Sequence, residues 1–493
     1  MRALRRARIV PPAALLLSPC WLPAGGNAAR EPGGPQVSVP RMVETGLRAG
    51  ILRVGAGHAF ATIGAALAAA EPGDTVVVGS GVYTEHLRIE RPVTLLGRGR
   101  PVIDGGGEGH VVEATAQLTL RGFVIRGSGT SVDHEDSGVM IRDASARVVD
   151  NRVEDVLYGI YLKNSRGSLI QGNRVAGKPL PLARRGDAIR LWYSNRVRII
   201  GNEVERARDV VVYFSDSLRV VDNVVRHGRY GLHYMYSNDN VFERNTFSEN
   251  EVGAFIMYSS RILLRDNVFA RARSTSGMGL GLKDADAIRV EGNLFVDNQV
   301  AVHLDNSPHS RDERNRFARN LLLFNRTGVR LLPSVRANLF EHNDIVGNGR
   351  PVEVAGRGSR EQASQNTWRE NHWSEYAGFD RKGDGTGDTP FEYARLTDDL
   401  LNRYPALQLF ARAPALGLVE MLSRFFPLLR PQPVVVDSAP SLASAQLARW
   451  RDRPPVSVLG GPETASSGGG AIAILWAGLA GLVLLALRRG TRW

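Results

Sequence analysis

Two methionines and a histidine form a soft ligand set in the middle of the chain. Met235 and Met257 are 22 residues apart, and His233 precedes Met235 by two positions. Thioether sulfur and imidazole nitrogen bind Cu(I) in preference to hard cations. These three residues are therefore candidate copper ligands, although methionines also form adaptable docking surfaces for other proteins. Met278, at the start of the next repeat, could supply another sulfur.

The spacing of 22 residues belongs to a repeat that runs through much of the sequence. A period in the low twenties, rich in Val, Ile, Leu, Gly and Asn, indicates a solenoid. The dense leucine signature of leucine-rich repeats is absent. An all-β fold is therefore expected, a right-handed parallel β-helix of about ten coils. An asparagine marks each repeat, at Asn151, Asn173, Asn202, Asn223, Asn245, Asn267, Asn293, Asn320 and Asn343.

In a parallel β-helix, residues one repeat apart lie on neighbouring rungs about 4.8 Å apart. Met235 and Met257 are therefore expected to be adjacent. Because side chains alternate across a strand, Leu232 and Tyr234 are expected to point inward and His233 and Met235 outward. The asparagine column is expected to form a stacked ladder whose amides bond along the solenoid axis.

The outward positions carry a contiguous aromatic and thioether patch. Exposed patches of this kind usually bind a ligand or a partner. We expect a partner-docking surface that surrounds the three candidate ligands. Two other interpretations stay open: the rings could stack on sugars, or the insertion at residues 177–187 could fold over them. The docking residues are Trp192, Tyr213, Phe255 and Met278.

A Gly-rich loop near the end of the repeats holds three carboxylates at a spacing of four residues. Asp380, Asp384 and Asp388 could wrap a calcium ion with oxygen ligands. Their spacing departs from the EF-hand pattern, so this loop is secondary to the copper ligands as a candidate metal site.

Parallel β-helices of the pectin-lyase type are often polysaccharide lyases, hydrolases or epimerases. Such reactions need clustered carboxylates for acid and base chemistry. The two outward columns offer one carboxylate, Asp305. We therefore predict that the protein is not an enzyme, and we keep an extracytoplasmic polysaccharide-binding or polysaccharide-modifying β-helix as the alternative. Carboxylates beside the aromatic strip would favour that alternative.

Both ends of the sequence indicate export and membrane attachment. Residues 1–29 are basic, then apolar, then small, as in a signal peptide, and they contain the only cysteine, Cys20. Residues 471–487 form an uncharged apolar run followed by arginines, which predicts a transmembrane helix and a cytoplasmic tail at 488–493. A periplasmic protein tethered to the inner membrane is expected. The formal net charge is +12, but no aromatic residues interleave with basic runs, so nucleic acid is not expected as a partner.

The remaining boundaries follow from composition. Residues 30–57 are expected to be a linker and residues 58–392 the β-helix, which begins with a short capping helix at residues 60–70. Capping is needed because an open solenoid end exposes unpaired backbone groups. Residues 393–430 predict a helical extension that packs on the solenoid end or docks on a membrane partner. Residues 431–470, rich in Pro, Ser and Ala, predict a tether.

Several stretches resemble the nitrous oxide reductase maturation proteins of the NosD family. The most specific is Gly231–Asp239, which reads Gly-Leu-His-Tyr-Met-Tyr-Ser-Asn-Asp, and it is supported by Phe255–Ser259. Shorter matches lie at residues 72–74, 83–85, 191–192, 383–390, 425–429 and 434–437, so the resemblance covers residues 58–440.

The resemblance implies a periplasmic β-helix that works with an ABC transporter, composed of a permease and an ATPase. This machinery takes part in assembling the copper–sulfur centre of nitrous oxide reductase in denitrification. A copper chaperone lipoprotein is implied as a further partner, with Cu(I) as a transient cargo. Two features depart from the family: Arg190 stands where histidine is expected, and the apolar run 471–487 is not a family feature.

Overall fold

The computed structural model describes residues 50–355, 363–410, 413–426 and 431–452. The predicted signal peptide with Cys20, residues 30–49 of the predicted linker, the apolar run 471–487 and the predicted tail at 488–493 lie outside the described residues. Among the helices that are described, none is long and apolar enough to cross a membrane.

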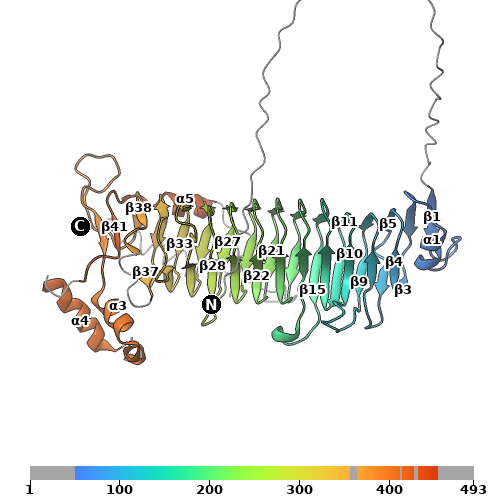
Figure 1. Cartoon of the computed structure of the whole chain (residues 1–493), viewed down its shortest axis with the longest axis horizontal. Helices are drawn as coiled ribbons and strands as arrows, with labels where there is room; N and C mark the ends of the chain where they lie inside the picture. Colours follow the sequence, from blue (N-terminus) through green and yellow to red (C-terminus); the bar gives the residue numbers. More distant parts are fainter. Residues whose placement is uncertain (1–49, 356–362, 411–412, 427–430, 453–493) are drawn as a thin grey trace, which may run out of the picture. The chain divides into compact units, whose positions relative to one another are not determined.

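Each coil of the solenoid contributes one short strand to each of three parallel sheets (Figure 1). We name them sheet I, with 12 strands, sheet II, with 16, and sheet III, with 13. The chain passes from sheet I to sheet II to sheet III and then advances by one rung. This is the right-handed parallel β-helix predicted from the repeat.

The strands are short throughout. Sheet I contains β4 (Leu87–Ile89), β7 (Val112–Ala114), β10 (Ser137–Arg142), β13 (Tyr158–Lys163), β16 (Ile189–Trp192), β19 (Asp209–Tyr213), β22 (Tyr230–Met235), β25 (Val252–Met257), β28 (Met278–Lys283), β31 (Val300–Asp305), β34 (Thr327–Leu331) and β37 (Arg350–Val354). Sheet II contains β1 (Ile51–Val54), β2 (Thr75–Val78), β5 (Val93–Gly97), β8 (Leu118–Arg121), β11 (Ala146–Val149), β14 (Leu169–Gln171), β17 (Arg198–Ile200), β20 (Arg219–Val221), β23 (Val241–Glu243), β26 (Leu263–Arg265), β29 (Arg289–Glu291), β32 (Asn315–Ala318), β35 (Asn338–Glu341), β38 (Thr367–Arg369), β41 (Val435–Asp437) and β40 (Phe391–Tyr393). Sheet III contains β3 (Val82–Thr84), β6 (Val102–Asp104), β9 (Val124–Arg126), β12 (Arg152–Val156), β15 (Arg174–Gly177), β18 (Glu203–Glu205), β21 (Val224–Arg226), β24 (Thr246–Ser248), β27 (Val268–Ala270), β30 (Leu294–Val296), β33 (Leu321–Leu323), β36 (Asp344–Val346) and β39 (His372–Trp373).

The solenoid is longer than the sequence predicted. About ten coils were expected, whereas sheet III has 13 strands in the described part of the chain. The asparagine column begins only at Asn151, so it misses the first coils. The linker prediction is also wrong at its end, because Ile51–Val54 already pairs with Thr75–Val78 as the first strand of sheet II.

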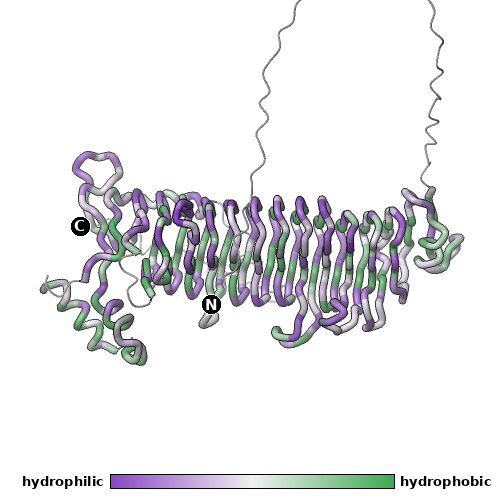
Figure 2. Tube along the Cα trace, viewed as in Figure 1, coloured by the Kyte–Doolittle hydropathy of each residue, from purple (hydrophilic) through white to green (hydrophobic). Residues whose placement is uncertain are grey.

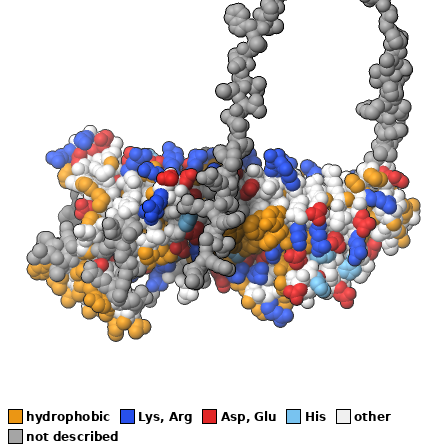
Figure 3. Space-filling view, in the orientation of Figure 1, with side chains coloured by type: hydrophobic (Ala, Val, Ile, Leu, Met, Phe, Trp, Pro, Cys, Tyr) orange, Lys and Arg blue, Asp and Glu red, His pale blue; other side chains and the backbone are white. Residues whose placement is uncertain are grey.

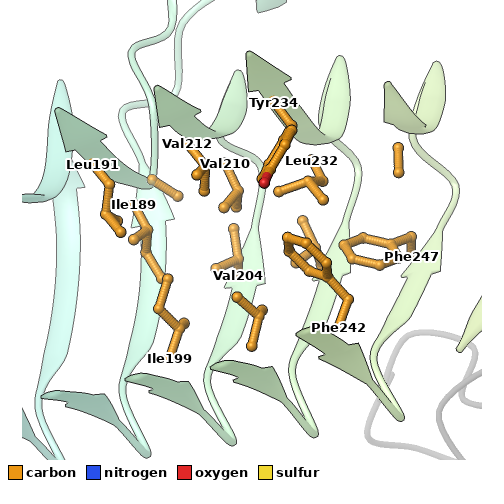
Figure 4. Close-up of a cluster of buried hydrophobic side chains, with 14 of the residues drawn as sticks. Ile189, Leu191, Ile199, Val204, Val210, Val212, Leu232, Tyr234, Phe242 and Phe247 are labelled. Atoms are coloured by element: carbon orange, nitrogen blue, oxygen red, sulfur yellow. The ribbon is translucent and has the colours of Figure 1, made fainter. Parts of the chain in front are cut away.

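Apolar side chains from all three sheets meet inside the coils. Figure 2 shows hydrophobic and hydrophilic residues interleaved along the chain, as alternation across short strands requires. In Figure 4 the inward residues of sheet I, such as Leu232 and Tyr234, face Phe242 and Phe247 from the other two sheets. These four side chains are buried, as the sequence predicted for Leu232 and Tyr234.

A ladder of buried asparagines runs along the turn between sheets II and III. At each step both the backbone N–H and the side-chain Nδ2 of one asparagine donate to Oδ1 of the next. Asn223 donates in this way to Asn245 at 3.0 and 2.9 Å, and Asn245 to Asn267 at 2.9 and 3.0 Å. The predicted ladder is confirmed, and it continues through Asn371 to Asp437.

The two ends of the solenoid are closed by different devices. Helix α1 (Ile63–Ala69) covers the first coil, with Thr62 as its N-cap and the Glu85 carboxylate accepting the N–H groups of Ile63 and Gly64. At the other end Asp437 accepts hydrogen bonds from Asn371 and from the Trp373 indole. This carboxylate ends the ladder with an acceptor, so the last asparagine donors are satisfied.

The predicted tether at 431–470 is wrong for residues 435–452. Strand β41 extends sheet II, and helix α5 (Ala445–Asp452) packs Leu447 and Trp450 on outward apolar residues of sheet III. Asp344 accepts the N–H groups of Gln446 and Leu447 at the start of α5. The stretch is rich in Pro, Ser and Ala, but it is ordered because the solenoid supplies it with tertiary contacts.

A helical hairpin follows β40. It consists of α3 (Leu396–Arg403), the 3-10 turn η2 (Pro405–Phe410) and α4 (Pro414–Phe425). Helix α4 turns polar residues toward the protein: Glu420 accepts a hydrogen bond from Thr397, and Ser423 is buried. Its apolar residues form a stripe that faces solvent instead. Hydrophobic residues gather at this end of the molecule in Figure 3. The stripe comprises Leu418, Met421, Leu422 and Phe425, the last of which is 72% exposed.

We predict that Asn245→Ala destabilises the solenoid by about 3 kcal/mol. The substitution removes Nδ2, which donates to Asn267 and to the Val220 carbonyl, and Oδ1, which accepts from Asn223, so buried partners lose their hydrogen bonds. Urea unfolding followed by circular dichroism measures the change. Asn195→Ala is the matched control, since Asn195 is exposed and its side chain accepts a single hydrogen bond, from the backbone N–H of Asp216. Equal unfolding midpoints for the two variants would contradict a structural role for the ladder.

Candidate functional site

The two methionines lie on neighbouring rungs of sheet I. Strands β22 and β25 pair with Met235 opposite Met257 and His233 opposite Phe255. All of these side chains belong to the outward face, and the exposed fraction of Met257 is only 9%. The register therefore brings two thioethers and one imidazole to one surface, as the spacing predicted. Their role as ligands stays a prediction.

The His233 ring is held on several sides. The Tyr213 hydroxyl lies 3.0 Å from Nδ1 and 3.1 Å from Nε2, and the Tyr230 ring lies against the imidazole with centroids 4.8 Å apart. A carboxylate oxygen of Asp209 is 3.4 Å from Nδ1. The side chain of His233 keeps 17% of its surface exposed. This arrangement orients the ring through its neighbours while leaving it in contact with solvent.

Two carboxylates lie beneath this surface with side chains that are 0% exposed. Asp209 binds Arg229 and accepts the backbone N–H of Tyr230. Asp187 binds Arg208 at 3.0 Å and Arg190 at 3.1 Å. Buried charges of this kind are tolerated only when they are paired and hydrogen-bonded.

Burial and pairing act in opposite directions on these groups. Burial would raise the pKa of Asp209, but its bonds to His233 and Arg229 outweigh burial and the pKa is lowered. For Asp187 burial is the larger effect and raises the pKa. Burial also raises the pKa of Tyr213 to about 12, with Asp187 adding to the shift. Tyr213 is therefore a neutral hydrogen-bonding partner of His233 at ordinary pH.

Arg190 occupies an aromatic box instead of providing a metal ligand. Its guanidinium lies 5.6 Å from the ring centre of Tyr158, 5.2 Å from that of Tyr161 and 5.9 Å from that of Trp192. Cation–π contacts and the bond to Asp187 hold it in place. The position where the family resemblance led us to expect histidine is thus used for packing and charge neutralisation in this chain.

The predicted docking residues lie on the outward surface of sheet I, but they do not all stack at the same position of successive strands. Trp192 contacts Tyr213 edge-on, with ring centroids 5.9 Å apart. Met278 pairs with Val252, so it lies in a different column from Met235 and Met257. Phe255 and Met278 close over Gly281, where an added Cβ would meet the Met278 sulfur at 2.6 Å. Met278 therefore extends the aromatic surface and does not join the methionine pair.

The insertion at 177–187 does not fold over the aromatic patch. Leu182 lines a depression of about 370 Å³ together with His227, Glu249 and Ser274, which lie beyond the strands of sheet III. Trp192 and Tyr213 remain partly exposed. The covering interpretation is therefore wrong for this loop.

The candidate calcium ligands Asp380, Asp384 and Asp388 accept hydrogen bonds from backbone amides, and calcium binding at this loop stays a prediction. The Asp380 carboxylate accepts N–H groups of Gly383 and Gly385, and Asp384 accepts that of Thr386. Asp388 accepts the N–H of Arg381. The Gly-rich loop folds so that its own amides satisfy the carboxylates. Within the described residues no three His, Cys, Asp or Glu side chains gather as a metal site.

Asp187 and Asp209 were not predicted from the sequence, because both precede the alternating apolar positions from which the inward and outward residues were assigned. A signal was present: the two residues are 22 apart and lie just before the inward residues Ile189 and Val210. A second periodic feature did not enter the prediction: an aromatic residue followed by serine recurs in four successive repeats. The aromatic residues are Tyr193, Phe214, Tyr236 and Tyr258. Both features follow the repeat period and flank the methionine pair.

Residues 172–378, which include His233, Met235 and Met257, match a family described as periplasmic copper-binding protein (NosD). A probable ABC transporter binding protein NosD of Pseudomonas aeruginosa is 27% identical over 436 residues, covering 79% of this chain and 95% of the relative. One of the same description from Stutzerimonas stutzeri is 27% identical over 381 residues, covering 73% and 85%. The middle of the chain therefore matches the NosD family model, and both relatives are described as NosD proteins. The family is described as periplasmic, which agrees with the predicted location.

Solved structures with a similar coil include the A-module of mannuronan C-5 epimerase AlgE6 from Azotobacter vinelandii, at 14% identity and a TM-score of 0.47. That likeness covers 60% of this chain and 91% of the other. The catalytic domain of a GH87 α-1,3-glucanase matches with 13% identity and a TM-score of 0.40, over 66% and 69% of the two chains.

We predict that Asp209→Asn lowers the free energy of unfolding by about 3 kcal/mol, because Arg229 would lose its buried carboxylate partner. Thermal and urea unfolding measure the loss. Asp239→Asn is the control: Asp239 pairs with Arg261 in the open, with both side chains at least half exposed, so its loss should cost less than about 1 kcal/mol. A similar loss in both variants would contradict the structural role assigned to Asp209.

Proposed function

We propose that this protein is a non-catalytic periplasmic accessory factor for assembly of the copper–sulfur centre of nitrous oxide reductase. It acts with an ABC transporter and handles Cu(I) or docks its donor, a copper chaperone lipoprotein. The observation that carries the proposal is the in-register pairing of Met235 with Met257 beside His233. The match of residues 172–378 to the family model and the names of the relatives support the same role.

The donor set suits a transient Cu(I) cargo. Two thioethers and an imidazole are soft neutral ligands, and they hold Cu(I) without the tight grip of thiolates. His233 is oriented by Tyr213 and Asp209, which reduces the rearrangement needed when an ion arrives. The three residues would hold the ion, and the surrounding aromatic rings would limit the access of water.

The test is maturation of the target enzyme. Cells with Met235→Leu and Met257→Leu should produce nitrous oxide reductase that lacks its copper–sulfur centre, because leucine preserves volume but removes sulfur. Copper content, visible absorption and activity of the purified enzyme measure the effect. Met278→Leu, in a separate column, should leave the centre intact. A fully loaded enzyme from the double variant, with the variant at normal abundance, would refute the ligand assignment.

We assign the exposed stripe of α4 to contact with the transporter permease. A helix that turns polar residues inward and apolar ones outward exposes a surface that gains free energy when an apolar partner covers it. The relatives' names, as ABC transporter binding proteins, support a transporter as that partner.

Leu418→Gln with Phe425→Gln should abolish copurification with the permease and ATPase in detergent, since two apolar contacts would be replaced by amides. The isolated variant should remain folded, because both residues are more than half exposed. Leu442→Gln, an exposed change away from α4, is the control. Unchanged copurification of the double variant would exclude this face as the contact.

A polysaccharide-modifying function is the second candidate. Asp187 and Asp209 lie beside the aromatic strip and His233, the arrangement that would favour an enzyme. Both side chains are fully buried and held by arginines, which weakens them as acid or base groups for a substrate. Formation of shortened or epimerised product from an acidic polysaccharide, detected by NMR, would favour this second function.

A further inference from the structure

Four aromatic side chains stack in a row at the turn between sheets I and II. We call Tyr193, Phe214, Tyr236 and Tyr258 the aromatic ladder. Successive ring centroids are 4.8, 5.3 and 5.1 Å apart, and the interplanar angles are 10°, 4° and 13°. The three tyrosines are 54%, 46% and 37% exposed. The ladder directly follows Trp192, Tyr213, Met235 and Met257 in sequence, so it borders the methionine pair on four consecutive coils.

The backbone beneath the ladder is left-handed at every rung, with φ of 50°, 50°, 49° and 51°. Bulky residues rarely adopt this conformation, whereas Asn and Asp tolerate it. The same turn position carries Asn164 before the ladder and Asp284 and Asn306 after it, at φ of 53°, 47° and 45°. The turn therefore does not require aromatic residues. In these four coils aromatic residues occupy a backbone conformation that favours Asn or Asp. Such strain is common at functional sites.

The stacking decides which surface the rings offer. The faces of the inner rings are covered by their neighbours, so a sugar could not stack on them. Trp192 is likewise enclosed by edge contacts from Tyr193, Tyr213 and Phe214. The ladder presents ring edges, whose C–H groups carry partial positive charge, together with the hydroxyl groups of its three tyrosines. Thioether sulfur favours contacts at ring edges, and aliphatic thioethers also adapt to irregular surfaces.

We propose that the aromatic ladder is a docking surface for a methionine-rich segment of a protein partner. The row of positive ring edges complements the lone pairs of thioether sulfurs, and the adjacent Met235 and Met257 place soft ligands at the same contact. The partner's chemistry rests on the proposed function, since a protein that exchanges Cu(I) with this site needs soft side chains of its own. Docking at the ladder itself does not require the metal.

The experiment uses the full-length protein in detergent and two labelled peptides in chelator-treated buffer. One peptide repeats Met-Ser-Met-Ser, and the other carries norleucine in place of every methionine. Fluorescence anisotropy should show the methionine peptide binding at least about threefold more tightly, because norleucine keeps the shape but lacks sulfur. Tyr236→Asn with Tyr258→Asn should weaken that binding by roughly tenfold.

The asparagine substitutions are matched to the fold, because neighbouring coils carry Asn at this turn. The variant should keep or raise its thermal midpoint, so weaker binding would not reflect unfolding. The peptides are tested without copper, so the result separates this inference from the copper-ligand assignment. Equal binding of both peptides, or unchanged binding by the ladder variant, would overturn the proposal. Ladder-dependent binding of an oligosaccharide instead of the peptide would also overturn it.

Discussion

Each coil of this solenoid is joined to the next by a buried asparagine that donates twice and accepts twice along the axis. The bonds between Asn223, Asn245 and Asn267 hold successive turns at one rung of separation. A slip of one residue would move apolar side chains to the surface and leave buried amides unpaired. Register is therefore strongly specified, and every functional column depends on it. Met235 meets Met257 for the same reason that Tyr234 meets Ile256 in the core.

The charged groups beneath sheet I show how a solenoid stiffens one part of its surface. Asp187 and Asp209 lie in a region of low solvent access, where arginines neutralise them and limit their chemistry. The two carboxylates position other side chains: Asp187 holds Arg190 under the aromatic rings, and Asp209 holds His233 beside Tyr213. Carboxylates next to an aromatic strip are therefore compatible with a site that binds and releases a cargo without catalysis.

Two apolar surfaces are exposed on a protein whose other apolar side chains are mostly buried. One is the stripe on α4, and the other is the aromatic patch over the middle coils, where Figure 3 shows hydrophobic side chains gathered. They belong to different elements and differ in kind. The α4 stripe is aliphatic and broad, which suits a membrane protein, whereas the ladder is rigid and offers ring edges. Separate surfaces would allow the protein to remain on a transporter while it exchanges cargo with a soluble or lipid-anchored partner.

Much of this arrangement could be derived from the amino-acid sequence. A period of 22 residues with alternating apolar positions determines which side chains face inward, because strands alternate and coils stack. This periodicity predicts the asparagine ladder and the pairing of Met235 with Met257. It also predicts that His233 points outward. The sequence could not reveal that residues 435–452 return to the solenoid, since their order comes from contacts with Asn371 and Asp344, remote in the chain. Nor could composition show that the carboxylates of the Gly-rich loop accept hydrogen bonds from the loop's own amides. The burial of Asp209 and the face-to-face stacking of the aromatic ladder were decided by tertiary structure, because solvent access and ring orientation depend on neighbouring coils and not on spacing alone.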